Sequence, residues 1–420
     1  MSVLEEFTWR GLLQDISDPE LFSKVKPGDA CYIGFDPTAP SLQVGNLVML
    51  IVSIHLTKMG LRPILLFGGA TGMIGDPGGR SAERNLLPLD QVAANVALQE
   101  AQAKRLWQNA GCTATPLIVN NIEWTRDVSM LTFLRDIGKH FTVNYMLAKD
   151  SVKSRLSGDG ISYTEFSYML LQAFDFLHLY QTQKCSLQFG GSDQWGNITA
   201  GLELIRRKIQ GEAYAFSVPL ITNSEGKKFG KSAGNAVWLD AALTSPYKFH
   251  QFWLNVPDSD VIRLIKVFTF EPKHAIEQIE RDAAAAPEKR IAQKFLADAL
   301  CTFVHGAEAT QHAKRCAEVL FGGSQEGLSS SELLEIFSEA PSSLVSRDQI
   351  DSLDMLSLLA TTVAKSKGEA RRLVQGGGIY VDNQRLAVET AALRDSGILD
   401  KGFIVLRSGK KNYHLVRIAE

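Results

Sequence analysis

Residues 32–46 read YIGFDPTAPSLQVGN, and this stretch indicates a strand, a tight loop and a helix in that order. The apolar run 30–35 stops at Asp36 and Pro37, because proline lacks a backbone donor and disfavours helix in the residue before it. An unbroken apolar segment starts at Leu47 and is long enough for a buried helix. This order directs the free N–H groups of the helix start above the strand end, where they suit an anionic ligand.

A plainer interpretation of the same stretch is a proline-terminated strand followed by a helix with Asn46 as an ordinary N-cap. The sequence that follows indicates a larger unit. A helix from Leu47 to about Met59 should end at Gly60, and PILLF at 63–67 is a short, continuous apolar strand. Strand, helix and strand at this spacing are typical of a βαβ unit with a parallel sheet.

A glycine-rich segment, GGATGMIGDPGGR, follows at residues 68–80. It matches neither the GxGxxG dinucleotide motif nor a P-loop. Two interpretations remain. The segment is either a loop that needs positive φ at several glycines, or a loop whose backbone approaches a ligand closely while Asp76 presents a carboxylate to it.

Three polar side chains interrupt the apolar segment YMLLQAFDFLHLY. Tyr168, Gln172 and Asp175 have the spacing i, i+4, i+7, so one face of a helix carries all three. Because burying an unpaired polar group costs on the order of several kcal/mol, these groups need partners. They belong either to a structural polar network or to a pocket for a polar aromatic ligand.

Two further motifs follow later in the chain. The first repeats the order of strand, loop and helix, and the second is rich in lysine. GGSDQWGNI at 190–198 follows a short strand and precedes a helix that Asn197 or Thr199 would open. Such repetition is expected when one nucleotide lies across the carboxyl edge of a parallel sheet. GKKFGKSAGN at 226–235 is a lysine-rich loop, and Glu225 stands where a P-loop needs its first glycine.

The composition is that of an ordinary soluble globular protein of two or three domains, with 420 residues, 45% hydrophobic and 21% charged. No apolar run approaches the roughly 18 residues needed to span a bilayer, and the start of the chain lacks the bias of a transit peptide. The five cysteines are scattered without a CxxC pair, which disfavours structural zinc and fits a reducing compartment. We therefore expect a cytoplasmic protein without a structural metal.

The charge is distributed unevenly. Residues 355–420 contain 11 Lys and Arg against 6 Asp and Glu, whereas the whole chain has a net charge of −2. KSKGEARRLVQGGGIYVDNQRL, from Lys365, indicates a basic helix, a glycine turn and a strand. This pattern suits an RNA-binding module, and a solvated helix face is the alternative. Helical periodicity dominates from Ser245 to about Phe321.

These motifs occur in an order that resembles the bacterial-type tyrosyl-tRNA synthetases, which are class I aminoacyl-tRNA synthetases, over essentially the whole chain. The resemblance implies an α/β Rossmann-like doubly wound parallel sheet, an all-α anticodon-binding domain and a small α+β RNA-binding module. The expected parts are a catalytic domain at 1–240 with a dimer interface at about 125–160, a helical domain at 241–325, a linker at 326–354 and the module at 355–420. From the residues alone, an internal core helix is as compatible with 130–156 as a dimer interface.

The resemblance also implies roles for individual residues. Tyrosine would be bound by Tyr32, Asp76, Tyr168, Gln172, Asp175 and Gln194, with Tyr32 and Asp175 at its hydroxyl group. ATP would be bound by Gly34, Asp36, Gly45, Gly191, Asp193 and Lys231. Catalysis would depend on Gln43 and Asn46 and on Lys228, Lys231 and Ser232 of a KMSKS-type loop. RNA would be bound by Lys365, Lys367, Arg371 and Arg372.

The implied enzyme is a homodimeric tyrosine–tRNA ligase that uses ATP and Mg²⁺ and charges tRNA(Tyr) through a tyrosyl-adenylate. The tyrosine carboxylate attacks the α-phosphate itself, so catalysis requires positioning and charge stabilisation rather than a protein nucleophile.

One departure concerns the first loop, where the family normally has two histidines and this chain has Gln43 and Asn46. Their amide N–H groups can donate equivalent hydrogen bonds without titrating. Two alternatives are a non-catalytic RNA-binding paralogue and a tryptophanyl-tRNA synthetase, and Tyr32 together with Asp175 disfavours the second.

Overall fold

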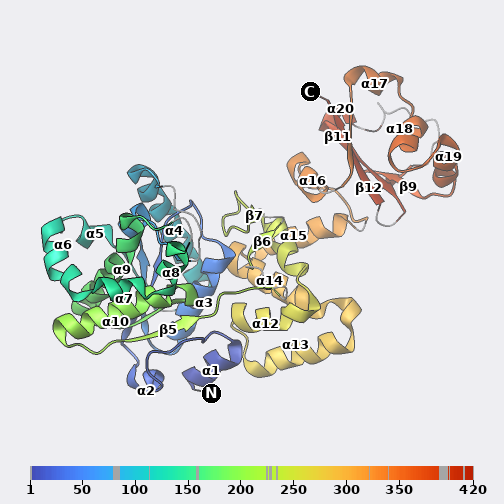
Figure 1. Ribbon diagram of the computed structural model, residues 1–420. Helices are drawn as coiled ribbons and strands as arrows, with labels where there is room; N and C mark the ends of the chain where they lie inside the picture. Colours follow the sequence, from blue (N-terminus) through green and yellow to red (C-terminus); the bar gives the residue numbers. More distant parts are fainter. Residues whose placement is uncertain are drawn as a thin grey trace. The chain divides into compact units, whose positions relative to one another are not determined.

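The computed structural model describes residues 2–78, 86–112, 114–157, 160–223, 226, 229–232, 235–320, 322–338, 340–386, 396, 398–409 and 412–419. The chain forms two compact units, Met1–Gly306 (unit 1) and Ala307–Glu420 (unit 2) (Figure 1). No helix within these described ranges is long and apolar enough to cross a membrane.

Unit 1 is built around a five-stranded parallel sheet with the order β3-β2-β1-β4-β5. The strands are β1 (Ala30–Phe35), β2 (Arg62–Phe67), β3 (Leu117–Asn120), β4 (Cys185–Gly191) and β5 (Tyr214–Val218). The chain runs outward from β1 in one direction through β2 and β3, and β4 then lies on the other side of β1. The order therefore reverses between β1 and β4, where ligands bind outside the carboxyl ends of the strands in folds of this kind. This arrangement confirms the predicted doubly wound sheet.

The helices of unit 1 cover the sheet and extend beyond it (Figure 1). They are α1 (Val3–Arg10), α2 (Leu21–Lys24), α3 (Val44–Lys58), α4 (Leu89–Asn109), α5 (Ile122–Thr125), α6 (Met130–Asp136), α7 (Val143–Leu147), α8 (Asp150–Leu156), α9 (Tyr163–Gln183), α10 (Trp195–Ile209), α11 (Pro246–Leu254), α12 (Asp258–Phe268), α13 (Lys273–Ala285) and α14 (Ile291–His305). Short 3₁₀ turns are η1 (Thr71–Met73), η2 (Gly138–His140), η3 (Ser192–Gln194) and η4 (Pro287–Lys289), and β6 (Lys231–Ser232) pairs with β7 (Asn235–Ala236).

Two predicted helix starts differ from the structure. Helix α3 begins at Val44 with Gln43 as its N-cap, so Asn46 lies inside the first turn rather than at the cap. Helix α10 begins at Trp195, because the 3₁₀ turn η3 leads directly into it and leaves neither Asn197 nor Thr199 as the opening residue. Both starts lie closer to the preceding strand than the sequence indicated, which brings the first helical turns nearer to the strand ends.

Amide side chains of α4 hold the loop between β1 and α3. Asn95 Nδ2 donates to the carbonyl of Pro37 (2.9 Å), and Gln99 Nε2 donates to that of Ala39 (2.8 Å). Gln102 Oε1 accepts the N–H of Leu42 (2.9 Å). Because these three residues lie on one helical face, α4 satisfies the buried backbone groups of a loop that has no ladder of its own.

Unit 2 contains a second sheet with the order β10-β9-β11-β12-β8. Its strands are β8 (Ser342–Val345), β9 (Ile379–Val381), β10 (Gln384–Arg385), β11 (Phe403–Ser408) and β12 (Asn412–Ile418), and its helices are α15 (Ala307–Val319), α16 (Ser330–Ile336), α17 (Arg347–Ser352), α18 (Met355–Thr362), α19 (Lys367–Gln375) and α20 (Ile398–Lys401). The basic helix, glycine turn and strand predicted from Lys365 correspond to α19, Gly376 to Gly378, and β9.

Two features of the predicted partition need correction. The stretch 326–354, expected to be a linker, contains α16, β8 and α17, and β8 pairs in parallel with β12 at the edge of the second sheet. Two of its serines are helix caps instead: Ser329 caps α16 and Ser346 caps α17. Helix α15, expected in the helical domain, belongs to unit 2. The boundary at residue 240 lies inside unit 1 and stays a prediction.

Candidate active site

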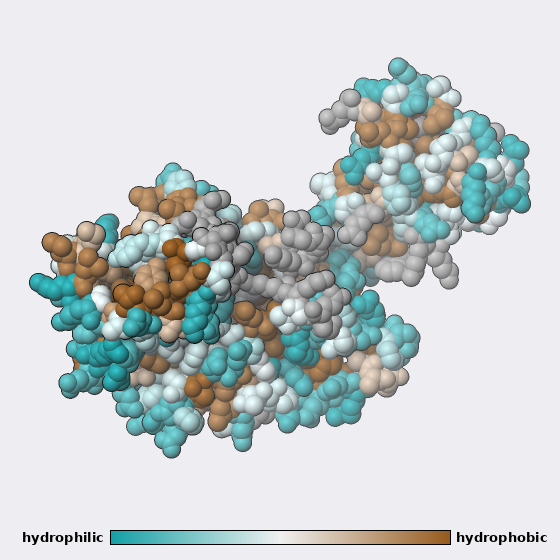
Figure 2. Space-filling view, in the orientation of Figure 1, coloured by the Kyte–Doolittle hydropathy of each residue, from teal (hydrophilic) through white to brown (hydrophobic). Residues whose placement is uncertain are grey.

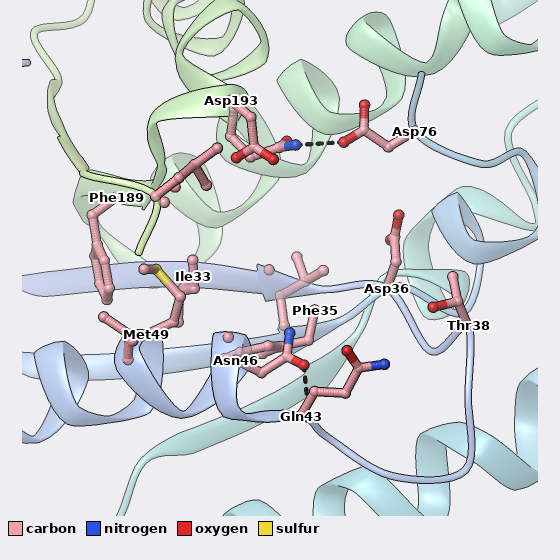
Figure 3. Close-up of a pocket in the computed structure, with 18 of the residues that line it drawn as sticks. Ile33, Phe35, Asp36, Thr38, Gln43, Asn46, Met49, Asp76, Phe189 and Asp193 are labelled. Atoms are coloured by element: carbon pink, nitrogen blue, oxygen red, sulfur yellow. Dashed lines mark hydrogen bonds between the residues drawn. The ribbon is translucent and has the colours of Figure 1, made fainter. Parts of the chain in front are cut away.

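A cavity of about 350 Å³ opens at the carboxyl ends of β1 and β4, at the reversal of strand order (Figure 3). Thirteen of the predicted tyrosine-, ATP- or loop-site residues line it: Tyr32, Gly34, Asp36, Gln43, Gly45, Asn46, Asp76, Tyr168, Gln172, Asp175, Gly191, Asp193 and Gln194. Among the described residues that line it, the charged side chains are four aspartates, Asp36, Asp76, Asp175 and Asp193. The cavity is therefore acidic and suits a cationic group.

At one end of the cavity, α9 places Asp175 beside Tyr32 of β1. Asp175 is 3% exposed, and its carboxylate accepts hydrogen bonds from Asn121 Nδ2 (2.9 Å) and from Trp124 Nε1 (2.8 Å). Burial raises the pKa of Asp175 to about 7, and these two donors oppose the rise. The Trp124 ring in turn stacks on His178, with 4.4 Å between the ring centroids.

The Tyr32 hydroxyl is the complementary group at this end. It is buried and has no hydrogen-bond partner among the described residues. Burial and the nearby Asp175 carboxylate raise the pKa of Tyr32 well above its ordinary value, so the hydroxyl stays protonated. A buried hydroxyl without a partner carries a desolvation cost that a ligand can remove. The end of the cavity is thus built for a ligand that carries a hydroxyl group.

A second polar cluster surrounds Asp76, which follows β2. Gln194 Nε2 donates to Asp76 Oδ2, and Asn197 Nδ2 lies 3.4 Å from Asp76 Oδ1. Tyr168 donates from its hydroxyl to Asp36 Oδ2 (2.8 Å). The cluster places two carboxylates and two amides around one part of the cavity, which is suitable for an ammonium group.

The third part of the cavity lies at the start of α3. Asn46 Oδ1 accepts the backbone N–H of Gln43 (2.9 Å), so the Asn46 amide nitrogen is turned away from that bond (Figure 3). The backbone N–H of Gly45 adds a further donor, whereas those of Val44 and Asn46 already donate to Val237 and Gln43. Apolar side chains of Met49 and Phe189 lie in the same part of the cavity. The combination suits a flat apolar ring joined to phosphate.

At most of the described glycines after β2, φ is not positive, and at two of them the missing side chain leaves room for neighbouring side chains. Of its glycines described up to residue 78, Gly75 has a positive φ of 85°. A methyl group at Gly68 would overlap the Thr71 hydroxyl and the Asp36 carboxylate, and one at Gly69 would overlap the Asn120 side chain. Among the described glycines of this segment, the first interpretation, a positive φ, therefore applies to Gly75. The second, a backbone that approaches a ligand closely while Asp76 presents a carboxylate to it, stays a prediction.

The lysine-rich loop adjoins the start of α3. Val44 donates its N–H to the carbonyl of Val237 (3.1 Å), and Leu239 donates to Leu42 (2.9 Å). Phe229 lines the cavity. Of the predicted loop residues, Lys228 lies outside the described residues, and Lys231 and Ser232 form strand β6, with side chains that are not described.

The predicted RNA-binding residues belong to unit 2, whereas the cavity belongs to unit 1. Lys367, Arg371 and Arg372 are exposed on α19, and Lys365 is exposed just before it. Lys365 donates its backbone N–H to Glu369 (2.7 Å), and Lys367 lies 3.7 Å from Asp354.

The residues that sequence reasoning missed include two that line the cavity, Thr71 and Gln188, and two partners of Asp175 outside the lining, Asn121 and Trp124. Asn121, Trp124 and Thr71 hold the aspartates, and the buried Gln188 lines the cavity with an Oε1 that has no partner among the described residues. The pair Asn120-Asn121 at the end of β3 was a usable signal, because polar residues at the carboxyl end of a parallel strand face the ligand edge. Trp124 and Gln188 gave no comparable pattern. Within the described part of the chain, no group of three or more His, Cys, Asp or Glu side chains could hold a metal ion.

Comparison with known proteins shows which family the chain resembles over its whole length. The family model "tRNA synthetases class I (W and Y)" matches residues 28–322, and "Tyrosine--tRNA ligase SYY-like C-terminal domain" matches residues 332–416. The chain is 47% identical to a tyrosine–tRNA ligase of Cytophaga hutchinsonii over 99% of both chains. It is 46% identical to that of Geobacillus stearothermophilus over 100% of both.

A solved structure agrees with these sequences. The C-terminally truncated mitochondrial tyrosyl-tRNA synthetase of Aspergillus nidulans superposes with a TM-score of 0.68 at 31% identity, covering 76% of this chain and 94% of that one. Similarity at this level over the full length, together with both family matches, determines the family. The chain belongs to the tyrosine–tRNA ligases of the class I aminoacyl-tRNA synthetases.

Proposed function

We propose that the cavity of unit 1 binds tyrosine and ATP side by side, forms tyrosyl-adenylate and pyrophosphate, and then transfers the tyrosyl group to tRNA(Tyr). The observation that carries this assignment is the pair at one end of the cavity, the unpartnered Tyr32 hydroxyl beside the Asp175 carboxylate. A phenol hydroxyl would donate to Asp175 and accept from Tyr32, so both groups would be satisfied at once.

This pairing accounts for choice of tyrosine over phenylalanine. Phenylalanine would leave the Tyr32 hydroxyl buried without a partner and would give Asp175 no donor beyond Asn121 and Trp124. Tyrosyl-tRNA synthetases are themselves a standard example of discrimination by unpaired polar groups. At the other end, Asp76, Tyr168 and Gln172 would hold the substrate ammonium group, with Gln194 fixing Asp76 through its hydrogen bond.

ATP would occupy the part of the cavity between α3 and η3. Its ring would lie near Met49 and Phe189, and its ribose near Gly191 and Asp193. The α-phosphate would meet Gly45 and the amide nitrogens of Gln43 and Asn46. The tyrosine carboxylate attacks this phosphate, and these donors would tighten as the phosphate becomes five-coordinate.

The departing pyrophosphate needs positive charge that the acidic cavity does not provide. Lys228 and Lys231 of the neighbouring loop would supply it, together with Mg²⁺ brought in by ATP. Mg²⁺ is commonly held by phosphates and one or two carboxylates, and Asp193 offers a carboxylate at the nucleotide end of the cavity. When bound, the ion neutralises charge on the phosphates.

Tyrosine–tRNA ligation would take place in a homodimer. Met130 and Leu131 of α6 are 74% and 77% exposed, and Val143 of α7 is 61% exposed. Figure 2 has apolar residues gathered on the side of unit 1 where Figure 1 places α6 and α7. A second copy is the natural occupant of so exposed an apolar face, because water contact with it is costly in a monomer. The exposure disfavours the alternative of an internal core helix.

Unit 2 would hold tRNA through the exposed cations Lys365, Lys367, Arg371 and Arg372 on and before α19. The excess of Lys and Arg over Asp and Glu after residue 355 favours phosphate contacts. We place the enzyme in the cytoplasm, where its five free cysteines would stay reduced.

The tyrosine pocket is tested by Asp175→Asn and Tyr32→Phe. Each variant removes one partner of the phenol, so the ratio of kcat/KM for tyrosine to that for phenylalanine should fall, by about fivefold for Tyr32→Phe and by about 10- to 100-fold for Asp175→Asn. ATP–pyrophosphate exchange with each amino acid measures the ratio. Tyr180→Phe, on α9 but outside the cavity lining, is the matched control. Unchanged ratios in both variants would refute the pocket assignment.

The phosphate role of Asn46 is tested by two variants that separate it from helix capping. Asn46→Asp keeps an oxygen to accept the Gln43 N–H but removes the amide donor, whereas Asn46→Ala removes both. Both should slow adenylate formation, on the order of 10²-fold for Asn46→Ala, with tyrosine affinity nearly unchanged. Single-turnover kinetics decides between the roles. An Asn46→Asp enzyme as fast as the parent would mean that Asn46 serves only the helix start.

The dimer proposal is tested by Leu131→Asp on α6. A charge in the centre of an apolar interface must be desolvated on association, so the variant should dissociate to monomers at concentrations where the parent is dimeric. Sedimentation velocity measures the state, and circular dichroism checks folding. Leu98→Asp on α4 replaces a leucine that is also exposed, at 48%, and should leave the dimer intact. Equal sedimentation of Leu131→Asp and the parent would exclude this face.

A further inference from the structure

One continuous chain of hydrogen bonds connects the two ends of the amino-acid site, and Thr71 lies at its middle. We infer that Thr71 is a positioning residue that fixes Asp36 and, through Asn121, Asp175, and thereby influences affinity at the ammonium end and selectivity at the phenol end together. The inference rests on the proposed function of these two ends. It assigns to Thr71 a role in specificity that does not require contact with the phenol.

The direction of each bond follows from the donors available. The backbone N–H of Ala70 donates to Asn121 Oδ1 (2.7 Å), which leaves Asn121 Nδ2 as the donor group. Asn121 Nδ2 then donates to Asp175 Oδ2 (2.9 Å) and to Thr71 Oγ1 (3.1 Å). Because Thr71 Oγ1 accepts this bond, its own proton is available for another acceptor.

That acceptor is Asp36. Thr71 Oγ1 donates to Asp36 Oδ1 (2.8 Å), while the hydroxyl of Tyr168 donates to Asp36 Oδ2 (2.8 Å). Both oxygens of Asp36 are therefore held by a hydroxyl group, one from η1 and one from α9. Burial and the Asp36 carboxylate raise the pKa of Tyr168 well above its ordinary value, so Tyr168 remains a donor.

The backbone leaves room for this arrangement at one position, Gly68. A methyl group there would overlap both Thr71 Oγ1 and Asp36 Oδ1, which are the two atoms of the central bond. Thr71 itself is 3% exposed, so water cannot replace a lost partner at low cost. The absence of a side chain at Gly68 and the hydroxyl at Thr71 are thus two separate requirements for the same bond.

Loss of the Thr71 hydroxyl should change the geometry of both the ammonium end and the phenol end of the amino-acid site. Asp36 would lose a donor to its carboxylate, and Asn121 would lose one acceptor of its Nδ2 group and gain freedom to turn away from Asp175. A donor or acceptor left unsatisfied in a buried site costs about as much as a tenfold change in an equilibrium constant. A residue that served folding alone would change the amount of active enzyme but not its choice between amino acids.

The test compares Thr71→Val, which is nearly isosteric but lacks the hydroxyl, with Thr71→Ser, which keeps it. In tyrosine-dependent ATP–pyrophosphate exchange, Thr71→Val should raise the KM for tyrosine about tenfold and reduce the tyrosine-to-phenylalanine ratio several-fold. Thr71→Ser should restore both quantities to near the parent values. Gly68→Ala, which displaces the same bond without changing Thr71, should reproduce the Thr71→Val result.

Two controls separate positioning from folding. Thr269→Val removes a similarly buried hydroxyl, which donates to Ile265 (2.8 Å) and does not belong to the cavity lining, and should leave KM and the ratio unchanged. In an Asp175→Asn background, the effect of Thr71→Val on the ratio should largely disappear, because the residue acts through Asn121 and Asp175.

Parent-like KM and ratio in either Thr71→Val or Gly68→Ala would overturn the inference, as would full additivity with Asp175→Asn. If Thr71→Val does not fold, Gly68→Ala decides alone. Absence of tyrosine-dependent exchange in the parent enzyme would instead contradict the proposed function, so the two failures are distinguishable.

Discussion

The site depends on keeping a carboxylate, Asp175, inside an apolar layer between helix α9 and the sheet. Burial alone would favour its neutral form, and burial raises its pKa to about 7. The donors Asn121 and Trp124 come from the segment after β3, two strands away from β1 in the sheet. The pocket therefore depends on the strand order, which brings β1, α9 and the end of β3 together.

The same topology explains the rest of the cavity. The reversal between β1 and β4 separates the loops that follow these strands and leaves the start of α3 open toward the ligand. Glycine at positions 68 and 69 leaves room for close packing, because a side chain there would overlap Thr71, Asp36 or Asn120. The described lining residues include no cationic side chain, so we propose that the lysines of the neighbouring loop neutralise the charge on leaving pyrophosphate.

Local patterns predicted much of this architecture. Three features could be predicted because each is encoded within a few residues: the strand that ends before Pro37, the helical face of Tyr168, Gln172 and Asp175, and the glycine motif at the end of β4. The partners of the aspartates could not be predicted, because Thr71, Asn121 and Trp124 meet Asp36 and Asp175 only through tertiary structure. The linker at 326–354 was wrong for the same reason: β8 has four residues, and its place in the sheet depends on pairing with β12, far away in sequence.

The most direct test of the account is the pH dependence of tyrosine binding. If the phenol hydroxyl donates to an ionised Asp175, affinity should be constant well above pH 7 and weaken as pH falls through about 7, approaching tenfold per unit below the pKa. The Asp175→Asn variant should lack this dependence. Equilibrium dialysis with labelled tyrosine from about pH 8.5 to about pH 5.5 covers the transition. Affinity that is independent of pH in the parent, or an identical dependence in Asp175→Asn, would contradict the central place given to this carboxylate.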